Sequence, residues 1–392
     1  MRKKLPALED LWAQHQGVSR DPRQIVAQWK EAAEVDFTLL HHHVNGAWWE
    51  ILEAARITLL ITREYEHIVM ALCVANGKPR VSYLPMPHPS GMALDPERNT
   101  LHLASTRNPN MVYEFAPCSS QLGSSQEQKA SRGLLLPRQA RYFPGCLYLH
   151  DLVMLGKELY GAAVGMNAIV RFPAAGGVVP AWWPACIEND GRPRFDKNFL
   201  QLNSIAAGRN LASSFFTASA AAPSSRRPGQ RHFPVDGQGV VFSGKTRDVV
   251  AGGLTRPHSL RFQRQELWVL NSGYGQLGRI DQAAFSPLLD LPGWTRGLCF
   301  HGALAFVGTS RVLPRFRNYA PGLEVDRSVC GVHIIDMKSA KVLGSLCWPM
   351  GNQIFAIEVA SLSWTQGFPF TFPRRRSQKR ETLFFFRGQP LA

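Results

Sequence analysis

A repeated hairpin unit constrains the fold of this chain more than any other feature of its sequence. In each clear copy, a polar residue precedes a strand-like apolar run, and a short turn then leads to a second run. The turns hold residues that favour chain reversal, such as Asp95-Pro96 in the first copy and Gly156-Lys157 in the second. Hairpins repeated in this way are typical of a β-propeller, whose blades bury their faces against one another.

The spacing of the units predicts an all-β propeller of about six blades over residues 46–360. Successive units begin about 40 to 60 residues apart, which fits one four-stranded blade each. Residues 57–74 precede the first unit and supply strands for a blade that residues 354–359 complete from the other end of the chain. Such a closure removes the exposed edge of the sheet. The unit starts lie near His88, His150, Asn203, His258, Arg296 and Asn352.

The two ends of the chain differ from this pattern. Residues 1–45 are predicted to be a helical segment, because Asp21 and Pro22 form a helix start and Ile25, Val26 and Trp29 recur at helical spacing. From Trp48 onward we expect strands. Residues 361–392 show no blade pattern and are predicted to be an irregular basic tail. Two insertions, at residues 118–138 and 218–238, interrupt the blades, and the second is expected on the face where the unit starts lie.

Charge and cysteine usage bear on the partners and the compartment. The formal net charge is +15, but much of the excess lies between Arg374 and Arg387 and in the loop 226–231. No nucleic-acid-binding motif accompanies it, so we expect no nucleic-acid partner. The seven cysteines form no C-x-x-C pair, which favours free buried thiols in a reducing compartment. Without a long apolar run we expect no membrane partner and a cytoplasmic protein.

The geometry of a propeller predicts where a site lies. The starts of the inner strands and the loops after the second strands meet at one mouth of the central channel, where convergent polar groups mark the default site. The predicted catalytic residues are His150, Asp151 and His258. The predicted ligand-binding residues are His88, Arg107, Asn108, Asn203, Asn271, Tyr274, Arg296, Arg311 and Asn352.

These residues allow three chemistries, which the sequence leaves open. His88, His150 and His258 form a candidate site for a divalent transition metal, with Asp151 as fourth ligand or general base. One histidine alone suits proton transfer near neutral pH. Alternatively, the arginines Arg107, Arg296 and Arg311 meet an anionic group without reaction. Structural roles compete with each of these, since asparagines bond turn backbone and Asp151 or Arg296 pairs with a neighbouring charge.

Long segments of the chain resemble a known family. These include HPSGMALDPERNTLHLAST (88–106), GLTRPHSLRFQRQELWVLNSGYG (253–275) and CGVHIIDMKSAKVLGSLCWPMGNQIFAIE (330–358). They look like a bacterial family, common in cyanobacteria, of conserved proteins of unknown function, some of whose members are joined to tetratricopeptide repeats. The resemblance implies a propeller-like fold and no particular reaction. After Glu358 the sequence departs from the family ending that we expect.

Two functions are therefore carried forward. The first is binding of, and possible action on, a small polar ligand at the histidine- and asparagine-lined mouth. The second is a non-catalytic scaffold that meets a protein partner through its rim loops and N-terminal helix. Whether the protein is an enzyme, and its oligomeric state, stay open.

Overall fold

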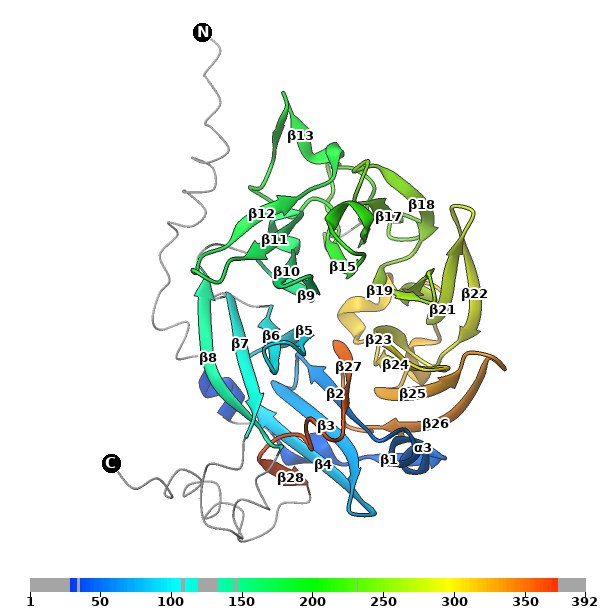
Figure 1. The fold of residues 1–392 in the computed structure, drawn as a ribbon. Coiled ribbons are helices and arrows are strands. Elements are labelled where there is room, and N and C mark those ends of the chain that lie inside the picture. The colour runs from blue at the N-terminus through cyan, green and yellow to red at the C-terminus, as the bar shows by residue number, and fades with distance from the viewer. Residues whose placement is uncertain are drawn as a thin grey trace.

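The central body of the chain is a ring of six antiparallel sheets around a channel, as Figure 1 shows. The structure is a computed structural model and describes residues 29–33, 36–106, 110–118, 133–143, 145, 147–230 and 232–372. Five of the sheets have four strands in chain order, and in the sixth the inner strand β27 comes from near the other end of the chain. Two of the sheets gain a fifth strand, β1 or β28, from the ends of the chain. The predicted six-bladed, all-β propeller is confirmed.

Each blade contributes one strand to every layer of the ring. The inner strands, which line the channel, are β27 (Ala356–Ser361), β5 (Pro89–Asp95), β9 (Leu149–Leu155), β15 (Leu202–Ala206), β19 (Pro257–Gln263) and β23 (Trp294–His301). The second strands are β2 (Ile57–Arg63), β6 (Thr100–Ser105), β10 (Glu158–Ala163), β16 (Phe215–Ala218), β20 (Glu266–Asn271) and β24 (Leu304–Ser310).

Two further layers lie outside these. The third strands are β3 (Ile68–Ala75), β7 (Asn110–Pro117), β11 (Ala168–Phe172), β17 (Gly239–Ser243), β21 (Gln276–Asp281) and β25 (Gly331–Asp336). The fourth strands are β4 (Lys78–Pro85), β8 (Leu135–Phe143), β12 (Val179–Trp182), β18 (Val249–Leu254), β22 (Ala284–Asp290) and β26 (Lys341–Cys347). A separate hairpin, β13 (Glu188–Asn189) with β14 (Arg192–Pro193), follows β12.

Both ends of the chain close the ring. The inner strand β27 pairs along the whole of β2 with Leu60 opposite Glu358, as the sequence predicts. The propeller extends beyond the predicted domain boundary at residue 360. The strand β28 (Phe370–Phe372) pairs with β4 and so becomes the outermost strand of the same blade. At the other end, β1 (His43–Gly46), inside the segment predicted to be helical, pairs with β26 of the last blade.

A helix stands where the sequence analysis expected strands. Residues Trp48–Ala55 form α3, in which Trp48 and Leu52, one helical turn apart, are both fully buried. Arg56 ends the helix in a left-handed conformation. The bulky residues WWEIL (48–52) have strand propensity, but their buried members recur at helical spacing. The prediction of strands from Trp48 onward is therefore wrong. Short helical turns are η1 (Phe37–Leu40), η2 (Val164–Met166), η3 (Ala185–Ile187), η4 (Leu211–Ser213), η5 (Ser272–Tyr274), η6 (Pro314–Tyr319) and η7 (Val325–Arg327).

Parts of the predicted ends lie outside the described residues. Of the predicted N-terminal helix, residues 29–33 are described and are helical, and the Trp29 ring meets Tyr113 of β7 edge-on at 6.0 Å. Residues 373–392, which hold most of the predicted basic tail, are not described. The described cysteines are free thiols, four buried and two half-buried. None of the described helices has the length and apolar character needed to cross a bilayer.

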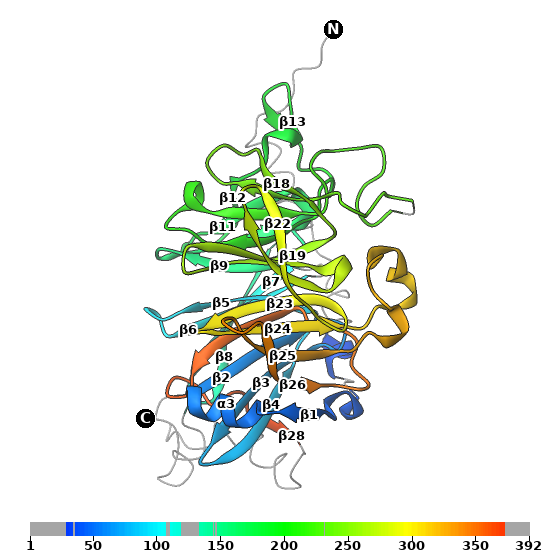
Figure 2. The ribbon, with the colours of Figure 1, turned by 90° about the vertical axis from the view of Figure 1, so that its right-hand side faces the viewer.

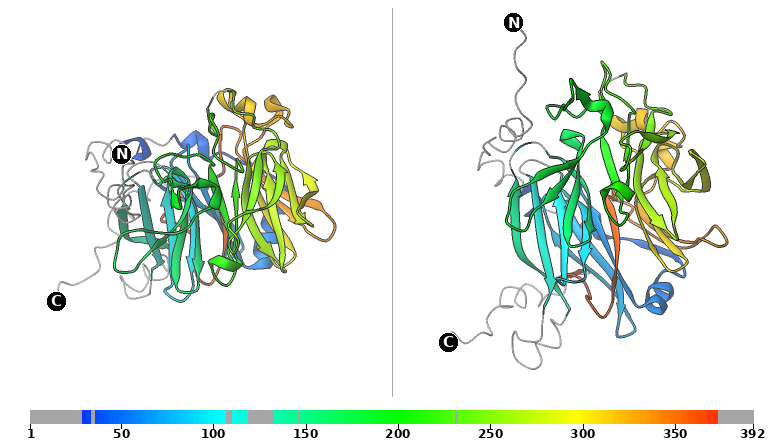
Figure 3. Two further views of the ribbon diagram at one scale, coloured as in Figure 1. Left: turned by 90° about the horizontal axis from the view of Figure 1, so that it is seen from above. Right: turned by 45° about the horizontal axis from the view of Figure 1, so that its top comes forward.

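Two insertions project from one face of the ring. The first carries η6 and η7 between β24 and β25, and the second is the long loop between β16 and β17 that the sequence analysis placed on the mouth side. In Figure 2 both stand on the right of the ring, in gold-orange and green, while α3 lies on the opposite side. Figure 3 shows the same arrangement from above. The inner strands begin on the face that carries these insertions, and we call it the mouth face.

Candidate functional site

In four blades the residue directly before the inner strand has a left-handed backbone. These residues, which we call the entry residues, are His88, Tyr148, Gln201 and Arg256, with φ of 43°, 50°, 54° and 52°. Positive φ is uncommon for residues other than glycine and costs energy unless the surroundings enforce it. The same uncommon backbone conformation occurs directly before the inner strand in four blades. It therefore indicates that these blades place the side chain of this residue at the mouth in the same way.

The strand register shows which residues are equivalent. The first residues of β9, β15 and β19 each pair with the last residue of the second strand, for example Leu149 with Ala163 and Pro257 with Asn271. His150, Asn203 and His258 therefore occupy the second position of their strands. In the blade of β5 that position is Ser90, because Pro89 pairs with Ser105. His88 lies two residues earlier than the sequence analysis supposed, so its equivalence to His150 and His258 is corrected.

A cavity of about 200 Å³ opens at the mouth, and three of the four entry residues line it. It is smaller than the roughly 300–1,000 Å³ of a site for a drug-sized molecule. Aromatic rings from η6 and from the first residue of β23 form much of its wall. Its lining residues are Glu64, Tyr65, Thr106, Tyr148, His150, Val164, Asn198, Gln201, Arg256, His258, Trp294, Arg296, Phe316, Tyr319 and Gln353.

Two predicted residues of the cavity wall, His150 and Arg296, meet each other, and His150 also meets Asn203 of a third blade. His150 Nδ1 lies 3.2 Å from Asn203 Oδ1 and 3.3 Å from Arg296 Nη2. The Asn203 amide donates to the Pro257 carbonyl, which only accepts, so Asn203 Oδ1 faces His150 Nδ1. The Arg296 guanidinium only donates, so an acceptor and a donor compete for the same ring nitrogen of His150. The Arg296 guanidinium lies over the Phe355 ring at 3.3 Å, and burial lowers its pKa to about 10.

His258 is held as a neutral ring with a defined proton position. Its Nδ1 lies 2.8 Å from the Arg256 carbonyl and 3.0 Å from Ser272 Oγ, which itself donates to the Thr295 carbonyl. Both neighbours accept from His258, so the proton is on Nδ1 and Nε2 is a hydrogen-bond acceptor. Burial, and then the positive charge of Arg296, hold the pKa of His258 well below its usual range.

Buried histidines, His258 and His333 among them, make stability depend on pH. Burial also lowers the pKa of His333, in β25, to about 4. The unfolded chain binds these protons near pH 6.5 while the folded chain does not, so stability is complete above that pH and falls as pH drops towards 4. We expect a loss of about 1.4 kcal/mol per pH unit for each histidine in urea unfolding. The variant His333→Gln removes its share of the slope, whereas His301→Gln at an exposed hairpin turn leaves the slope unchanged.

Asp151 does not take part in the mouth cavity. Its carboxylate receives both arms of Arg261 at 2.8 and 3.0 Å, and it also accepts from the backbone N–H of Ile205 and Leu152. With its oxygens occupied by these donors, it has the charge-pairing role that the sequence analysis gave as the alternative to metal ligation or general-base catalysis.

Arg261 and Glu358 line a second cavity, of about 380 Å³, at the other end of the channel, and burial raises the pKa of Glu358 to about 7.

The remaining predicted residues lie on the rim or in loop supports. Asn271 accepts from the Thr255 backbone N–H at 2.7 Å and so holds the linker to β19. Tyr274 is half-buried and donates to Asp236, and exposed Arg311 donates weakly to the Pro349 carbonyl at 3.4 Å. Asn352 lies beside the cavity, and its backbone N–H donates to Glu66. Arg107 and Asn108 are outside the described residues.

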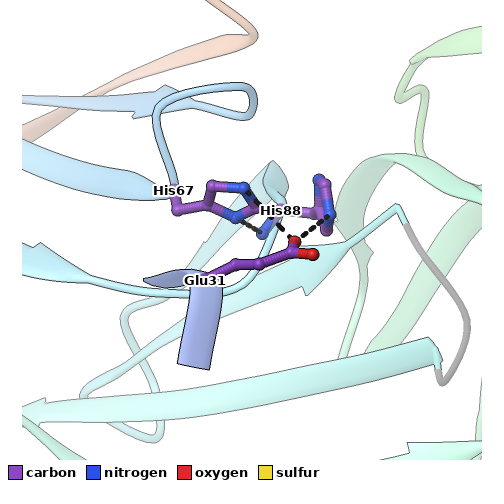
Figure 4. A group of neighbouring side chains, drawn as sticks. All are labelled: Glu31, His67 and His88. Atoms are coloured by element: carbon purple, nitrogen blue, oxygen red, sulfur yellow. Dashed lines mark hydrogen bonds and ion pairs between the residues drawn. The ribbon is translucent and has the colours of Figure 1, made fainter. Parts of the chain in front are cut away.

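The predicted metal set of three histidines is not assembled. Among the described residues, the ligand atoms of one group approach within 4.8 Å of one another, and it consists of Glu31, His67 and His88, without His150 or His258 (Figure 4). The His88 backbone N–H donates to His67 Nδ1 at 3.2 Å, which places the His67 proton on Nε2, the atom 3.9 Å from Glu31. A ligating nitrogen must be unprotonated. This tautomer therefore suits an interaction with Glu31 and does not suit a metal.

Comparison with known proteins shows the family and the fold of the chain. The domain of unknown function DUF4915 matches residues 46–365. The chain belongs to this family. No curated protein matches the sequence.

Three solved structures illustrate the likeness of the DUF4915 ring to other proteins. A nidogen/laminin complex chain is 11% identical, with 78% of this chain and 99% of that chain covered and a TM-score of 0.49. A protein of unknown function from Bacteroides caccae is 10% identical, with coverage of 77% and 98% and a TM-score of 0.48. A gluconolactonase from Xanthomonas campestris is 13% identical, with coverage of 75% and 86% and a TM-score of 0.46. At these values the likenesses assign no ligand to this chain.

Sequence reasoning missed three of the four entry residues of the DUF4915 ring, Tyr148, Gln201 and Arg256. Arg256 stands two residues before His258 in the motif RPHS, and Gln201 stands two before Asn203 in QLN. Aligning the units on the first strand residue and then stepping one residue back finds both. The aromatic residues of η6 cannot be found by aligning the units, because they belong to a long insertion that lies outside the repeat.

Proposed function

We propose that the mouth cavity of this DUF4915 protein binds a small polar ligand that carries hydroxyl groups. The observation that carries the proposal is the set of left-handed entry residues, three of which line a single cavity from three successive blades. Uncommon backbone conformations persist where the fold enforces them, and they cluster at ligand sites.

The chemistry of the cavity supports a hydroxyl-bearing ligand. His258 offers an accepting nitrogen, and Gln201 and Asn198 offer amides. The rings of Trp294, Phe316 and Tyr319 suit the C–H faces of a compact polyol or sugar-like molecule. The cavity volume excludes a nucleotide-sized ligand. The protein then acts as a binding propeller, and His258 is its candidate proton acceptor if the ligand is also transformed.

The replacement of His258 by glutamine tests the site. Saturation-transfer NMR against polyols, monosaccharides, hydroxy acids and sugar phosphates identifies a bound probe with the wild-type protein. We expect His258→Gln to weaken its binding about 3- to 10-fold, because one hydrogen bond to the ligand is lost. His301→Gln, on an exposed turn away from the cavity, leaves binding unchanged. If no probe binds the wild type, or if both variants behave alike, the proposal fails in favour of the scaffold.

A further inference from the structure

Arg256 is a buried cation with no carboxylate partner among the residues that the structure describes. The residue is 2% exposed, and its Nη1 donates to Gln201, while within the described part of the chain Nε and Nη2 have no hydrogen-bond partner. The guanidinium lies over the Tyr319 ring at 3.9 Å. Burial lowers its pKa to about 10, against the opposing effect of Tyr319, and the group stays charged at neutral pH. A buried charge without a paired anion is costly, so folded proteins rarely keep one for stability alone.

The other charges around the cavity leave that cation uncompensated. Glu64 is the carboxylate among the described residues lining the cavity, and it receives a hydrogen bond from Thr106 Oγ1. The charge of Glu64 acts on Arg296, whose pKa it raises against the effect of burial. For Arg256, burial and Tyr319 are the influences on the pKa, and no carboxylate of the described residues is among them. Burial and, after it, the nearby charges of Arg296 and Arg256 lower the pKa of His258, so this part of the cavity wall favours an anion over a cation.

We propose that Arg256 binds an anionic group of the ligand, a carboxylate or a phosphate, through the paired Nε and Nη2 edge of its guanidinium. This inference rests on the proposed function and specifies its ligand class. The Nε–Nη2 edge presents two parallel N–H donors, and this spacing matches two oxygens of a carboxylate or phosphate. Gln201 and the Tyr319 ring fix the orientation of the guanidinium. The ligand is then a small hydroxyl-bearing anion, with its acidic group at Arg256 and a hydroxyl at His258.

A matched series of three-carbon compounds tests the inference on the full chain. Glycerate carries a carboxylate, glycerol 3-phosphate carries a phosphate, and glycerol carries neither. We expect one of the two anions to bind at least about tenfold more tightly than glycerol in calorimetry at constant ionic strength, and the better anion identifies the acidic group. Equal affinity for glycerol and both anions overturns the inference and leaves the proposed function standing. No binding of any of the three, while an uncharged probe of the wider screen binds, overturns the inference alone; no binding of any probe in the wider screen overturns both.

The variant Arg256→Met separates a ligand-binding arginine from a structural one. Methionine keeps much of the side-chain volume and removes the buried charge. We expect anion binding to fall about 10- to 100-fold, while the melting temperature of the unliganded protein stays the same or rises by about 1–3 °C. Arg256→Lys keeps the charge but loses the paired edge, and binding is intermediate. Arg279→Met, at an exposed pair with Glu266, leaves binding unchanged. A lower melting temperature together with retained anion binding in Arg256→Met overturns the inference.

Discussion

A chain shortened to end at Phe355 loses the cooperative unfolding transition of the full protein, whereas a chain shortened to end at Phe372 keeps it. The first deletion removes β27 and β28, the inner and outer strands of the blade that closes the ring. Ile357 and Phe368, both buried to 1% or less exposure, leave the core with them, and each contributes about 1.5–3 kcal/mol. The pairing along β2 is lost as well, and the sum approaches the 5–15 kcal/mol that stabilises a typical protein.

The comparison of the two shortened chains isolates the closing strands. Both lack residues 373–392, so a difference between them arises from residues 356–372 alone. Thermal unfolding followed by circular dichroism and size-exclusion chromatography measures it. We expect the shorter chain to aggregate, because the backbone groups of β2 that pair with β27 become an unpaired edge. Equal melting temperatures for the two chains would contradict the closed ring.

The variant Arg261→Met destabilises the protein by about 3–5 kcal/mol, because it leaves the Asp151 carboxylate buried without its cation. Arg261 and Asp151 are 17% and 6% exposed in their side chains, and the inner strands β9 and β19 hold them together across the channel. Urea unfolding measures the loss. The double variant Asp151→Asn with Arg261→Met leaves no uncompensated charge, and we expect it to recover a large part of the stability.

An exposed pair gives the control for this prediction. Arg279 and Glu266 are more than two-fifths exposed and lie on adjacent strands of the same blade as Arg261. Solvent screens such pairs, so Arg279→Met costs less than about 1 kcal/mol. Similar losses for Arg261→Met and Arg279→Met would show that Asp151 does not depend on Arg261.

The ring itself could be predicted from the sequence because its determinants are local. Turn residues such as Asp95-Pro96 and alternating apolar runs specify each hairpin within about 20 residues. The match of residues 354–359 to the first blade followed from the need to cover a sheet edge. The helix α3 was missed because Trp48 and Ile51 favour strands as residue types, and only packing of Trp48 against the last blade decides between the two.

The sequence predicts that the inner-strand starts lie at one mouth, but not which of their side chains line a cavity there. His150, His258 and Arg296 line the mouth cavity, whereas Asn203 and His88, also near inner-strand starts, are not among its lining residues. Alignment of the units gives the positions of Arg256 and Gln201, but their left-handed backbone could not be predicted, because neither residue is a glycine. The grouping of His88 with His67 depends on a turn between β2 and β3 that the repeat does not include.

The entry residues lie just outside the hydrogen-bonded ladder of the blades. Substitutions in the strands and substitutions at the entry residues therefore have different consequences. A substitution in β9, β15 or β19 changes packing with the neighbouring blade, so it is constrained by the fold. A substitution at Tyr148, Gln201 or Arg256 changes what the mouth presents while every strand keeps its register. A descendant or a designed version of this ring is therefore able to acquire a new ligand by exchanging single entry residues, with the architecture left intact.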